Sequence, residues 1–327
     1  MHSSLKHSTS RAQAQACPRC HSESYLTLFR ASDRLYRTTD QRFNVVECAN
    51  CALMRLDPMP SPEVLKSFYP ESYWWHADES TSSRLAEIYR DFVLRDHVRF
   101  VAHALDSKGP LLDIGCGGGS FLHALRNEKV TAFGLDTSWR AAHVASSRFD
   151  LPAACGALPD LPFRPASFGT ITMFHVLEHV PDPLACLHAI ARLLKPGGKL
   201  VVQVPNADCW QLLLLGERWS GLDVPRHLTH FRADDLEELL VVCGFAVKRK
   251  KFFSLRDNPA GLATSLSPQL EPVARRVRGV QESQATRLVK DLLYFGLVVA
   301  ALPFTLLEAA GAAGSSVMVE AVLQGER

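Results

Sequence analysis

Apolar runs alternate with amphipathic stretches through the middle of the chain. Short apolar runs are typical of buried strands, whereas apolar residues spaced three or four apart are typical of helices. The alternation predicts a doubly wound α/β fold, in which helices cover both faces of a parallel sheet and ligands bind beyond the carboxyl ends of the strands. The expected strands are 110–114, 131–135, a short one near 153, 168–173, 198–204, 245–254 and 316–323, and the expected helices are 119–127, 138–148, 183–194 and 233–243.

Changes in composition divide the rest of the chain. The first segment is polar and rich in Ser and Gln, without the apolar core of a secretory signal, so we expect a disordered tail. A proline-rich stretch, Asp57-Pro58-Met59-Pro60-Ser61-Pro62, follows a cysteine-containing module. The expected units are the tail (1–16), the module (17–56), a connector with a helical lead-in (57–106), the α/β core (107–254 and 315–327) and a helical insertion (255–314).

One stretch of the insertion, residues 292–307, contains no charged residue. A helix needs about 20 apolar residues to span a bilayer. This run is shorter and contains Pro303, so we expect it not to span a membrane. A helix that is apolar on every side is predicted to be buried against the core, in an oligomer interface or over a substrate pocket. Peripheral contact with a membrane surface is the alternative interpretation.

Composition and charge indicate an ordinary globular protein. Hydrophobic residues make up 47% of the chain and charged residues 21%, and the net charge is +2. Such a balance argues against nucleic acid as the partner, because a nucleic-acid-binding surface requires an excess of Lys and Arg. The nine cysteines and the absence of a leader favour a reducing compartment, so we expect a cytoplasmic protein.

Four of the cysteines form two knuckles. Cys17 and Cys20 enclose two residues, Cys48 and Cys51 do the same, and 27 residues separate the pairs. Tetrahedral zinc takes four thiolates that converge from two such turns. This spacing predicts a zinc-ribbon-like module with a structural zinc. A site closed by four cysteines leaves no position for water or substrate, so the metal would not catalyse.

A glycine turn follows the first core strand. The sequence from 111 to 120 is Leu-Leu-Asp-Ile-Gly-Cys-Gly-Gly-Gly-Ser, and Ser120 stands where a dinucleotide fingerprint would have its last glycine. Asp113 beside the turn would repel a pyrophosphate but attract an ammonium and a sulfonium. Asp136, at the end of the next strand, is placed to meet ribose hydroxyls. The pattern favours S-adenosylmethionine over NAD.

From about Leu111 onward, the chain resembles the class I S-adenosylmethionine-dependent methyltransferases. The resemblance implies that Asp113, Gly115, Gly117 and Asp136 bind the cofactor, with Ala157 and Leu158 beside the adenine. It also implies that the last strand of the sheet is antiparallel. The matching segments are 112–119 (Leu-Asp-Ile-Gly-Cys-Gly-Gly-Gly), 134–136 (Gly-Leu-Asp), 174–183 (Phe-His-Val-Leu-Glu-His-Val-Pro-Asp-Pro) and 194–200 (Leu-Lys-Pro-Gly-Gly-Lys-Leu).

Two groups of histidines are candidates for chemistry. His175, Glu178 and His179 follow the 168–173 strand and would share one face if the segment were helical. The stretch resembles the Glu-x-x-Glu-His pattern of ubiquinone-pathway O-methyltransferases, which is associated with a divalent ion, with His175 in place of the first glutamate. A metal role is one interpretation. The other is that these residues shape the floor of the pocket.

The second group lies in Asp223-Val-Pro-Arg-His-Leu-Thr-His-Phe, residues 223–231. Loops at this end of the sheet carry acceptor specificity. We predict that His227 is a base or an orienting group, supported by Asp223, Arg226 and His230. The alternative is that Arg226 and His230 only tie the loop down.

The combined prediction is a methyltransferase that acts on a small molecule or a saccharide. Methyl transfer is an in-line displacement, and a base such as His175, His179 or His227 is needed only when the acceptor arrives protonated. Similar sequences with a zinc-knuckle N-terminus occur among bacterial methyltransferases of saccharide and other small-molecule pathways, and oxygen is the expected acceptor atom. The alternatives are a ribosomal RNA methyltransferase and a non-catalytic module that binds S-adenosylmethionine.

Overall fold

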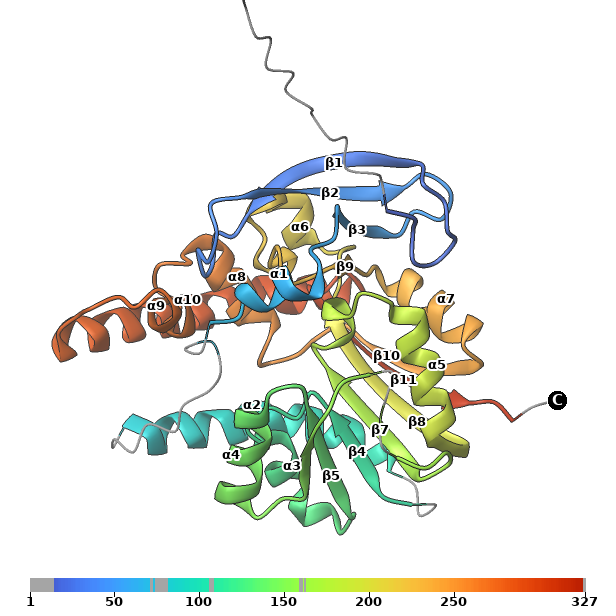
Figure 1. The fold of residues 1–327 in the computed structure, drawn as a ribbon. Helices are drawn as coiled ribbons and strands as arrows, with labels where there is room; N and C mark the ends of the chain where they lie inside the picture. Colours follow the sequence, from blue (N-terminus) through green and yellow to red (C-terminus); the bar gives the residue numbers. More distant parts are fainter. Residues whose placement is uncertain are drawn as a thin grey trace, which may run out of the picture.

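The computed structural model describes residues 15–70, 73, 82–105, 109–158, 161 and 163–325, with residues 82–91 and 127 described by their backbone alone. Most of the predicted tail lies outside these residues. The described chain forms two sheets (Figure 1): a large α/β sheet and a smaller antiparallel sheet above it.

The large sheet has seven strands in the order β10-β11-β8-β7-β4-β5-β6. Five neighbouring strands, from β8 to β6, are parallel, and β11 lies antiparallel between β8 and β10. This confirms the predicted fold class, including the antiparallel last strand. The strands are β4 (Leu111–Ile114), β5 (Ala132–Asp136), β6 (Ala153–Cys155), β7 (Phe168–Phe174), β8 (Leu194–Pro205), β10 (Phe245–Lys251) and β11 (Ser316–Leu323).

Alternate residues of these strands feed two apolar cores, because successive side chains of a strand point to opposite faces. Leu111 and Val201 pack with α2 (Ser82–Ala104) and α3 (Ser120–Leu125) on one face. Leu112 and Val202 pack with α5 (Pro183–Leu193) and α7 (Ala233–Val242) on the other. Helix α4 (Trp139–Phe149) packs beside β5 and β6. The sheet is therefore covered on both sides, as predicted for a parallel sheet.

The predicted core strands and helices are present, and their boundaries differ by a few residues. The largest difference is in β8, which begins at Leu194 instead of residue 198. Its first residue pairs with Phe168 across an irregularity in the ladder, so the Lys195-Pro196-Gly197-Gly198 turn lies inside the strand. The glycine and proline residues of this segment predict a turn from the sequence. The segment becomes part of the sheet only because it pairs with the neighbouring strand β7.

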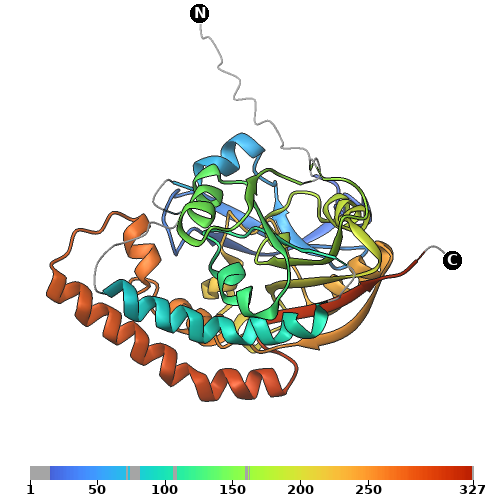
Figure 2. The ribbon, with the colours of Figure 1, turned by 90° about the horizontal axis from the view of Figure 1, so that it is seen from below.

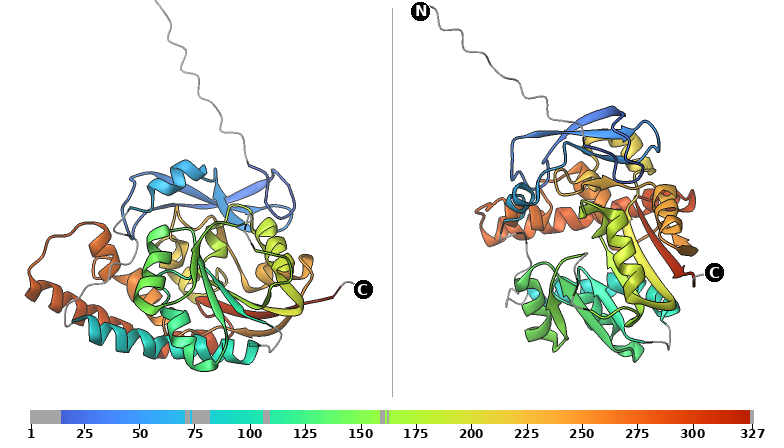
Figure 3. Two further views of the ribbon diagram at one scale, coloured as in Figure 1. Left: turned by 60° about the horizontal axis from the view of Figure 1, so that its bottom comes forward. Right: turned by 45° about the vertical axis from the view of Figure 1, so that its right-hand side comes forward.

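The smaller sheet has the order β1-β2-β3-β9, and all of its pairs are antiparallel. Three strands come from the N-terminal module: β1 (Tyr25–Ser32), β2 (Arg42–Cys48) and β3 (Met54–Asp57). The fourth, β9 (Thr229–His230), comes from the loop after β8. The module therefore lies over the carboxyl ends of the core strands (Figures 1 and 3), and the loop with His227 joins its sheet.

The insertion holds α8 (Asn258–Leu266), α9 (Pro272–Val277) and α10 (Gln284–Ala310), and α9 and the start of α10 extend beyond both sheets (Figures 1 and 2). Of the settings predicted for residues 292–307, burial against the core is wrong, because only 22% of an apolar 18-residue stretch of α10 is buried. An oligomer interface or a place over a substrate pocket stays a prediction. Among the described residues, α10 is the one helix that could cross a membrane by length and composition. Pro303 lies inside the helix on its exposed side, where water can satisfy the carbonyl that loses its amide partner.

Short elements connect these units. Their bounds are α1 (Pro62–Ser67), α6 (Trp210–Leu215) and single 3-10 turns at Arg126–Glu128, Leu177–His179, Gly216–Arg218 and Ser220–Leu222.

Candidate active site

The glycine turn leaves β4 in a conformation that side chains rarely adopt. Gly115 has φ +76° and Gly117 has φ +52°. A Cβ on Gly115 would lie 2.2 Å from Cγ2 of Val176, whereas a Cβ on Gly117 would meet no protein atom within 4 Å. Gly115 therefore lets the turn approach the segment after β7, and Gly117 leaves open space in which a ligand can reach the backbone.

The two predicted acids lie at the ends of neighbouring strands. Both oxygens of Asp136 accept backbone N–H groups, from Gly117 (2.9 Å) and Ser138 (2.8 Å). Asp113 is buried and accepts a hydrogen bond from the Thr172 hydroxyl at 2.7 Å. Burial, together with the nearby charge of Asp136, raises the pKa of Asp113 to about 7, against the effect of Thr172. Two buried carboxylates of like charge make a site that favours a cationic ligand.

The residues implied for the adenine follow β6, next to the strand of Asp136. Ala157 is exposed, and Leu158 is half-buried and packs against the core. The amide of Gly156 donates to the carbonyl oxygen of Asp136 at 3.0 Å, so this segment is tied to the end of β5. All the predicted cofactor residues therefore come from the ends of β4, β5 and β6.

A cavity of about 320 Å³ lies beyond the glycine turn, on the side of β7. His175 and His227 both line it, with Tyr36 from the module and Asp257 and Tyr294 from the insertion. His175 is next to Val176, which contacts the glycine turn, so the cavity adjoins the predicted cofactor site. Core, module and insertion each contribute to its wall. This cavity is our candidate for the acceptor site.

His175 does not share a helical face with Glu178 and His179. It has φ +55°, and the 3-10 turn begins only at Leu177. Its Nδ1 is 3.2 Å from Oε1 of Glu178, and its Nε2 is 3.5 Å from Oδ2 of Asp257. Burial opposes a charge on this ring, but the two carboxylates outweigh it and raise the pKa of His175 to about 10. His175 is therefore a cation at neutral pH.

His227 presents a free nitrogen to the cavity. Its Nδ1 lies 2.8 Å from the carbonyl oxygen of Gly221. A carbonyl can only accept, so Nδ1 carries the proton, and Nε2 of the neutral ring is left as an acceptor. Nε2 lies 3.9 Å from both Glu178 Oε1 and Asp223 Oδ2. A ring nitrogen in this state can accept a proton.

His179 lies behind His227 and does not line the cavity. The two rings meet edge to face, with centroids 4.6 Å apart. Nδ1 of His179 is 3.0 Å from the carbonyl oxygen of Arg226, and burial and the neighbouring His227 lower the pKa of His179 to about 4. Glu178, His179 and His227 each offer a ligand atom, and these atoms lie within 4.8 Å of one another. Among the predicted metal ligands, His175 thus contacts Glu178, but it is His227 that forms a cluster with both Glu178 and His179.

The family follows from the match to a known domain. A family model described as "Methyltransferase domain" matches residues 85–250, just over half of the 327-residue chain. The chain belongs to the class I S-adenosylmethionine-dependent methyltransferases. The predicted family is confirmed, and S-adenosylmethionine is the methyl donor that this family uses.

Relatives of this methyltransferase include two proteins named ubiquinone biosynthesis O-methyltransferase. That of Paracidovorax citrulli is 36% identical over 140 residues, which cover 37% of this chain and 57% of the relative. That of Xanthomonas oryzae pv. oryzae (strain PXO99A) is 31% identical over 179 residues, covering 49% of this chain and 68% of the relative. The chain thus spans little more than half the length of the first.

Among solved structures, a similar chain comes from the complex between the Haloferax volcanii Trm112 methyltransferase activator and a methyltransferase. Its TM-score is 0.50 at 21% identity, with 74% of this chain and 93% of that chain covered. At this identity the likeness shows the shared fold alone.

The four module cysteines of the methyltransferase converge. Sγ of Cys17 is 3.5 Å from Sγ of Cys51, and Sγ of Cys20 is 3.5 Å from Sγ of Cys48. All four sulfur atoms lie within 4.8 Å of one another. The knuckles pack on α7, where Arg19 forms ion pairs with Asp235 and Glu238.

Several polar residues of the methyltransferase site carry no signal in the sequence. Asp257 and Tyr294 reach the cavity from the insertion, and Asp33 of the module pairs with Arg226. A carboxylate after a strand can be recognised beside a glycine turn, but these residues meet the site only through contacts distant in the chain. Asp33 and Arg226 are 193 positions apart.

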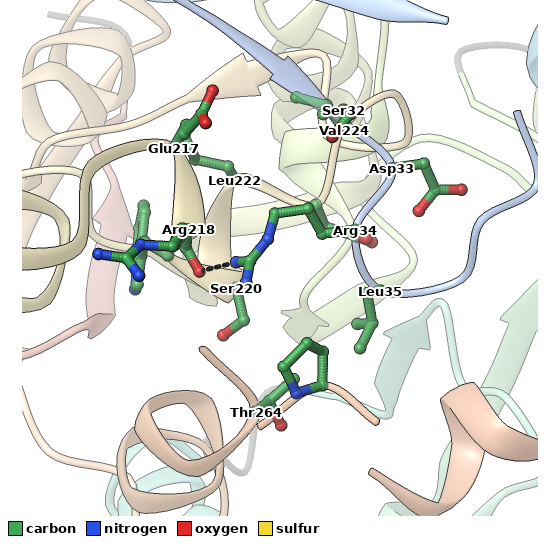
Figure 4. A pocket seen from close by; sticks show the side chains of 13 residues that line it. Ser32, Asp33, Arg34, Leu35, Glu217, Arg218, Ser220, Leu222, Val224 and Thr264 are labelled. Carbon is green, nitrogen blue, oxygen red and sulfur yellow. Dashed lines mark hydrogen bonds between the residues drawn. The ribbon is translucent and has the colours of Figure 1, made fainter. Parts of the chain in front are cut away.

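A second hollow lies between the β1–β2 connection and residues 217–224 (Figure 4). The guanidinium of Arg34 donates to the carbonyl oxygen of Arg218 across it, at 2.7 Å. Its volume is about 30 Å³, against about 320 Å³ for the cavity that His175 and His227 line. The smaller hollow is therefore the poorer candidate for an acceptor site, and it shows how closely the module meets residues 217–224.

Proposed function

We propose that this methyltransferase transfers a methyl group from S-adenosylmethionine to a hydroxyl of a small molecule or saccharide held in the 320 Å³ cavity. The observation that carries the proposal is the hydrogen bond from Nδ1 of His227 to the Gly221 carbonyl, which leaves Nε2 as a base facing the cavity. Relatives named ubiquinone biosynthesis O-methyltransferase support oxygen as the acceptor atom.

The reaction is a single displacement. As the acceptor oxygen bonds to the methyl carbon, its proton passes to Nε2 of His227, and the carbon–sulfur bond breaks with its electrons retained by sulfur. The products are the methyl ether, neutral S-adenosylhomocysteine and an imidazolium that releases its proton to water. Glu178 and Asp223, each 3.9 Å from Nε2, stabilise that imidazolium. Such a base contributes about 10²- to 10⁴-fold in rate.

His175 has a different role in this proposal. Asp257 and Glu178 keep it protonated, so it cannot take a proton from the acceptor at neutral pH. It is a cation on the cavity wall beside Val176 and hence beside the glycine turn. Because both of its ring nitrogens face carboxylates, we assign it to orienting the acceptor through its positive charge, and we assign His179 to supporting the ring of His227.

The same cluster supports a second way to activate the hydroxyl. Glu178, His179 and His227 can together bind a divalent ion, which would lower the pKa of a coordinated hydroxyl. The two alternatives differ in their response to a chelator. After EDTA treatment that metal analysis shows to leave the module zinc bound, a free base keeps its activity, whereas a metal site loses it and regains it when the divalent ion is restored.

We also propose that the four module cysteines bind a structural zinc. Tetrahedral Zn–S bonds of about 2.3 Å place sulfur atoms about 3.8 Å apart. The two measured 3.5 Å separations agree with that arrangement. Metal analysis of the purified protein should give one zinc per chain, and Cys20→Ser with Cys51→Ser should remove it. Absence of zinc from protein purified without chelator contradicts the proposal.

The function is tested by supplying labelled S-adenosylmethionine with phenols, catechols, sugar nucleotides and ribosomal RNA. We expect label in one of the small-molecule classes and a fall of at least 10²-fold in kcat for His227→Asn. His188→Asn, on an exposed position of α5, is the matched control and should retain full activity. Labelling of RNA alone would replace the proposal with the RNA alternative. Donor binding without any transfer would support the non-catalytic one.

A further inference from the structure

The loop that carries His227 is bound into the sheet of the cysteine module. Strand β9 pairs with β3, with Met54 opposite His230 and Arg55 opposite Thr229. The amide of Leu56 donates to the carbonyl oxygen of Leu228 at 2.9 Å, and the amide of Leu228 donates to the carbonyl oxygen of Glu178 at 2.7 Å. The backbone directly after His227 is thus clamped between the module and the turn after β7.

A buried ion pair clamps the residue directly before His227. Asp33, in the connection after β1, accepts two hydrogen bonds from the guanidinium of Arg226, at 2.7 and 3.1 Å. Both side chains have no exposed surface. The same guanidinium donates to Asp223 at 2.7, 3.1 and 3.2 Å and lies 4.5 Å above the ring of Tyr36. The module therefore contacts Arg226 through Asp33 and Tyr36, and Asp223 of the same loop provides the second carboxylate.

Asp223 connects Arg226 to the cavity. Its carboxylate binds Arg226 and lines the cavity with its Oδ2 3.9 Å from Nε2 of His227. The amides of Arg226 and His227 both donate to the carbonyl oxygen of Asp223, at 2.9 and 3.1 Å. A shift of Arg226 would therefore move Asp223 and His227 together.

We propose that Asp33 is a positioning residue for methyl transfer, and that the N-terminal module serves to hold the acceptor side of the active site through the Asp33–Arg226 pair. The inference rests on the proposed function, in which His227 is the base. Loss of the Asp33 charge leaves a buried guanidinium with one carboxylate instead of two. Arg226 would then draw Asp223 away from Nε2 of His227.

The module contains a matched control for this inference. Arg55 and Asp57 form a second buried ion pair, with 2.7 Å between Nη1 and Oδ1 and side chains that are 1% and 6% exposed. Neither residue lines the cavity. Asp57→Asn thus removes a buried carboxylate from the same sheet without touching Arg226. Asp40→Asn, at an exposed position near Asp33, controls for the surface charge of the loop.

Kinetics of the full chain test the proposal. We expect Asp33→Asn to lower kcat/KM for the acceptor by at least 10-fold, with the Kd for S-adenosylhomocysteine changed less than twofold. Asp57→Asn should lower thermal stability by about as much as Asp33→Asn does, but its kcat/KM should stay within about threefold of the wild-type value. In a His227→Asn background, Asp33→Asn should cause no further loss, because it acts through the missing ring. Equal kinetic losses for the two buried aspartates, or multiplicative losses with His227→Asn, overturn the proposal.

A readout independent of activity separates this inference from the proposed function. Hydrogen exchange of residues 223–231 and the NMR signals of labelled His227 report the loop directly. Asp33→Asn should accelerate exchange there and shift the His227 signal, whereas Asp57→Asn should not. An unchanged loop in Asp33→Asn refutes the positioning role whatever the chemistry. Full activity of His227→Asn with a disturbed loop in Asp33→Asn refutes the base and retains the positioning role.

Discussion

Gly115 and Val176 approach so closely that a single added Cβ on Gly115 would lie 2.2 Å from Cγ2 of Val176. The contact joins the glycine turn after β4 to the segment after β7, one residue from His175. It links the predicted cofactor site to the cavity, because His175, the residue before Val176, lines that cavity. Only glycine at position 115 fits beside Val176 in this arrangement.

The first prediction concerns this contact. Gly115→Ala must accommodate both φ +76° and the overlap with Val176, so we expect a destabilisation of about 1–3 kcal/mol. Calorimetry should show at least a 10-fold weaker Kd for S-adenosylmethionine. Gly296→Ala, in helix α10 with no protein atom near the added methyl group, should leave donor binding unchanged. Unaltered donor affinity in Gly115→Ala would show that the turn does not bind the donor.

The second prediction concerns Asp136. Its oxygens each accept one backbone N–H, and their remaining lone pairs are available to ribose hydroxyls. Asp136→Asn replaces one acceptor with an amide that meets another N–H donor, so we expect at least 10-fold weaker binding of S-adenosylhomocysteine. A 2′,3′-dideoxy analogue should bind both proteins with similar affinity. If the analogue shows the same loss, the ribose assignment is wrong.

The third prediction is a pH dependence set by Asp113. Burial first, and then the charge of Asp136, raise the pKa of this carboxyl from 3.8 to about 7. A raised pKa favours folding while the group is protonated, so its contribution to stability is complete below pH 3.8 and is lost as pH rises through 7. A cationic ligand prefers the ionised form. Donor affinity should therefore increase with pH up to about 7 and then level off.

Calorimetry between pH 5.5 and 8.5 measures this dependence, with Asp113→Asn as the comparison. The variant should bind the donor more weakly and should lose the rise below pH 7. It should also lose the corresponding fall in the Tm of the ligand-free protein. A rise of equal slope in both proteins assigns the titration to another group.

The parts of this site that could be predicted from sequence are those encoded by neighbouring residues. The glycine turn and the acids after β4 and β5 follow from local pattern, because a strand, a glycine turn and a helix are specified within about ten residues. The two cysteine knuckles can likewise be recognised from the spacing of their cysteines. Asp33 and Asp257 could not be recognised in this way, since only folding brings them to Arg226 and His175.

Three structural features also escaped local pattern. Strand β9 has two residues, and its pairing with β3 depends on a partner more than 170 positions away. The backbone of His175 has φ +55°, so this residue does not continue the predicted helical face. Histidine rarely adopts this conformation, and no neighbouring residue in the sequence predicts it. The uncharged run begins only at Leu292, because charged residues precede it. Those charged residues belong to the same helix, so the helix is longer than the run.

The last prediction concerns removal of the module metal. Cys48 and Cys51 bracket the turn between β2 and β3, and β3 pairs with the strand that follows His227. Loss of zinc should therefore loosen the acceptor loop before it affects the glycine turn, which belongs to the other sheet. We expect Cys20→Ser with Cys51→Ser to lower kcat/KM for the acceptor by at least 10-fold, while the Kd for S-adenosylhomocysteine changes less than threefold. Ser24→Ala, at an exposed position of the module, should match the wild type. If donor binding fails together with catalysis, the module supports the whole fold and not the acceptor side alone.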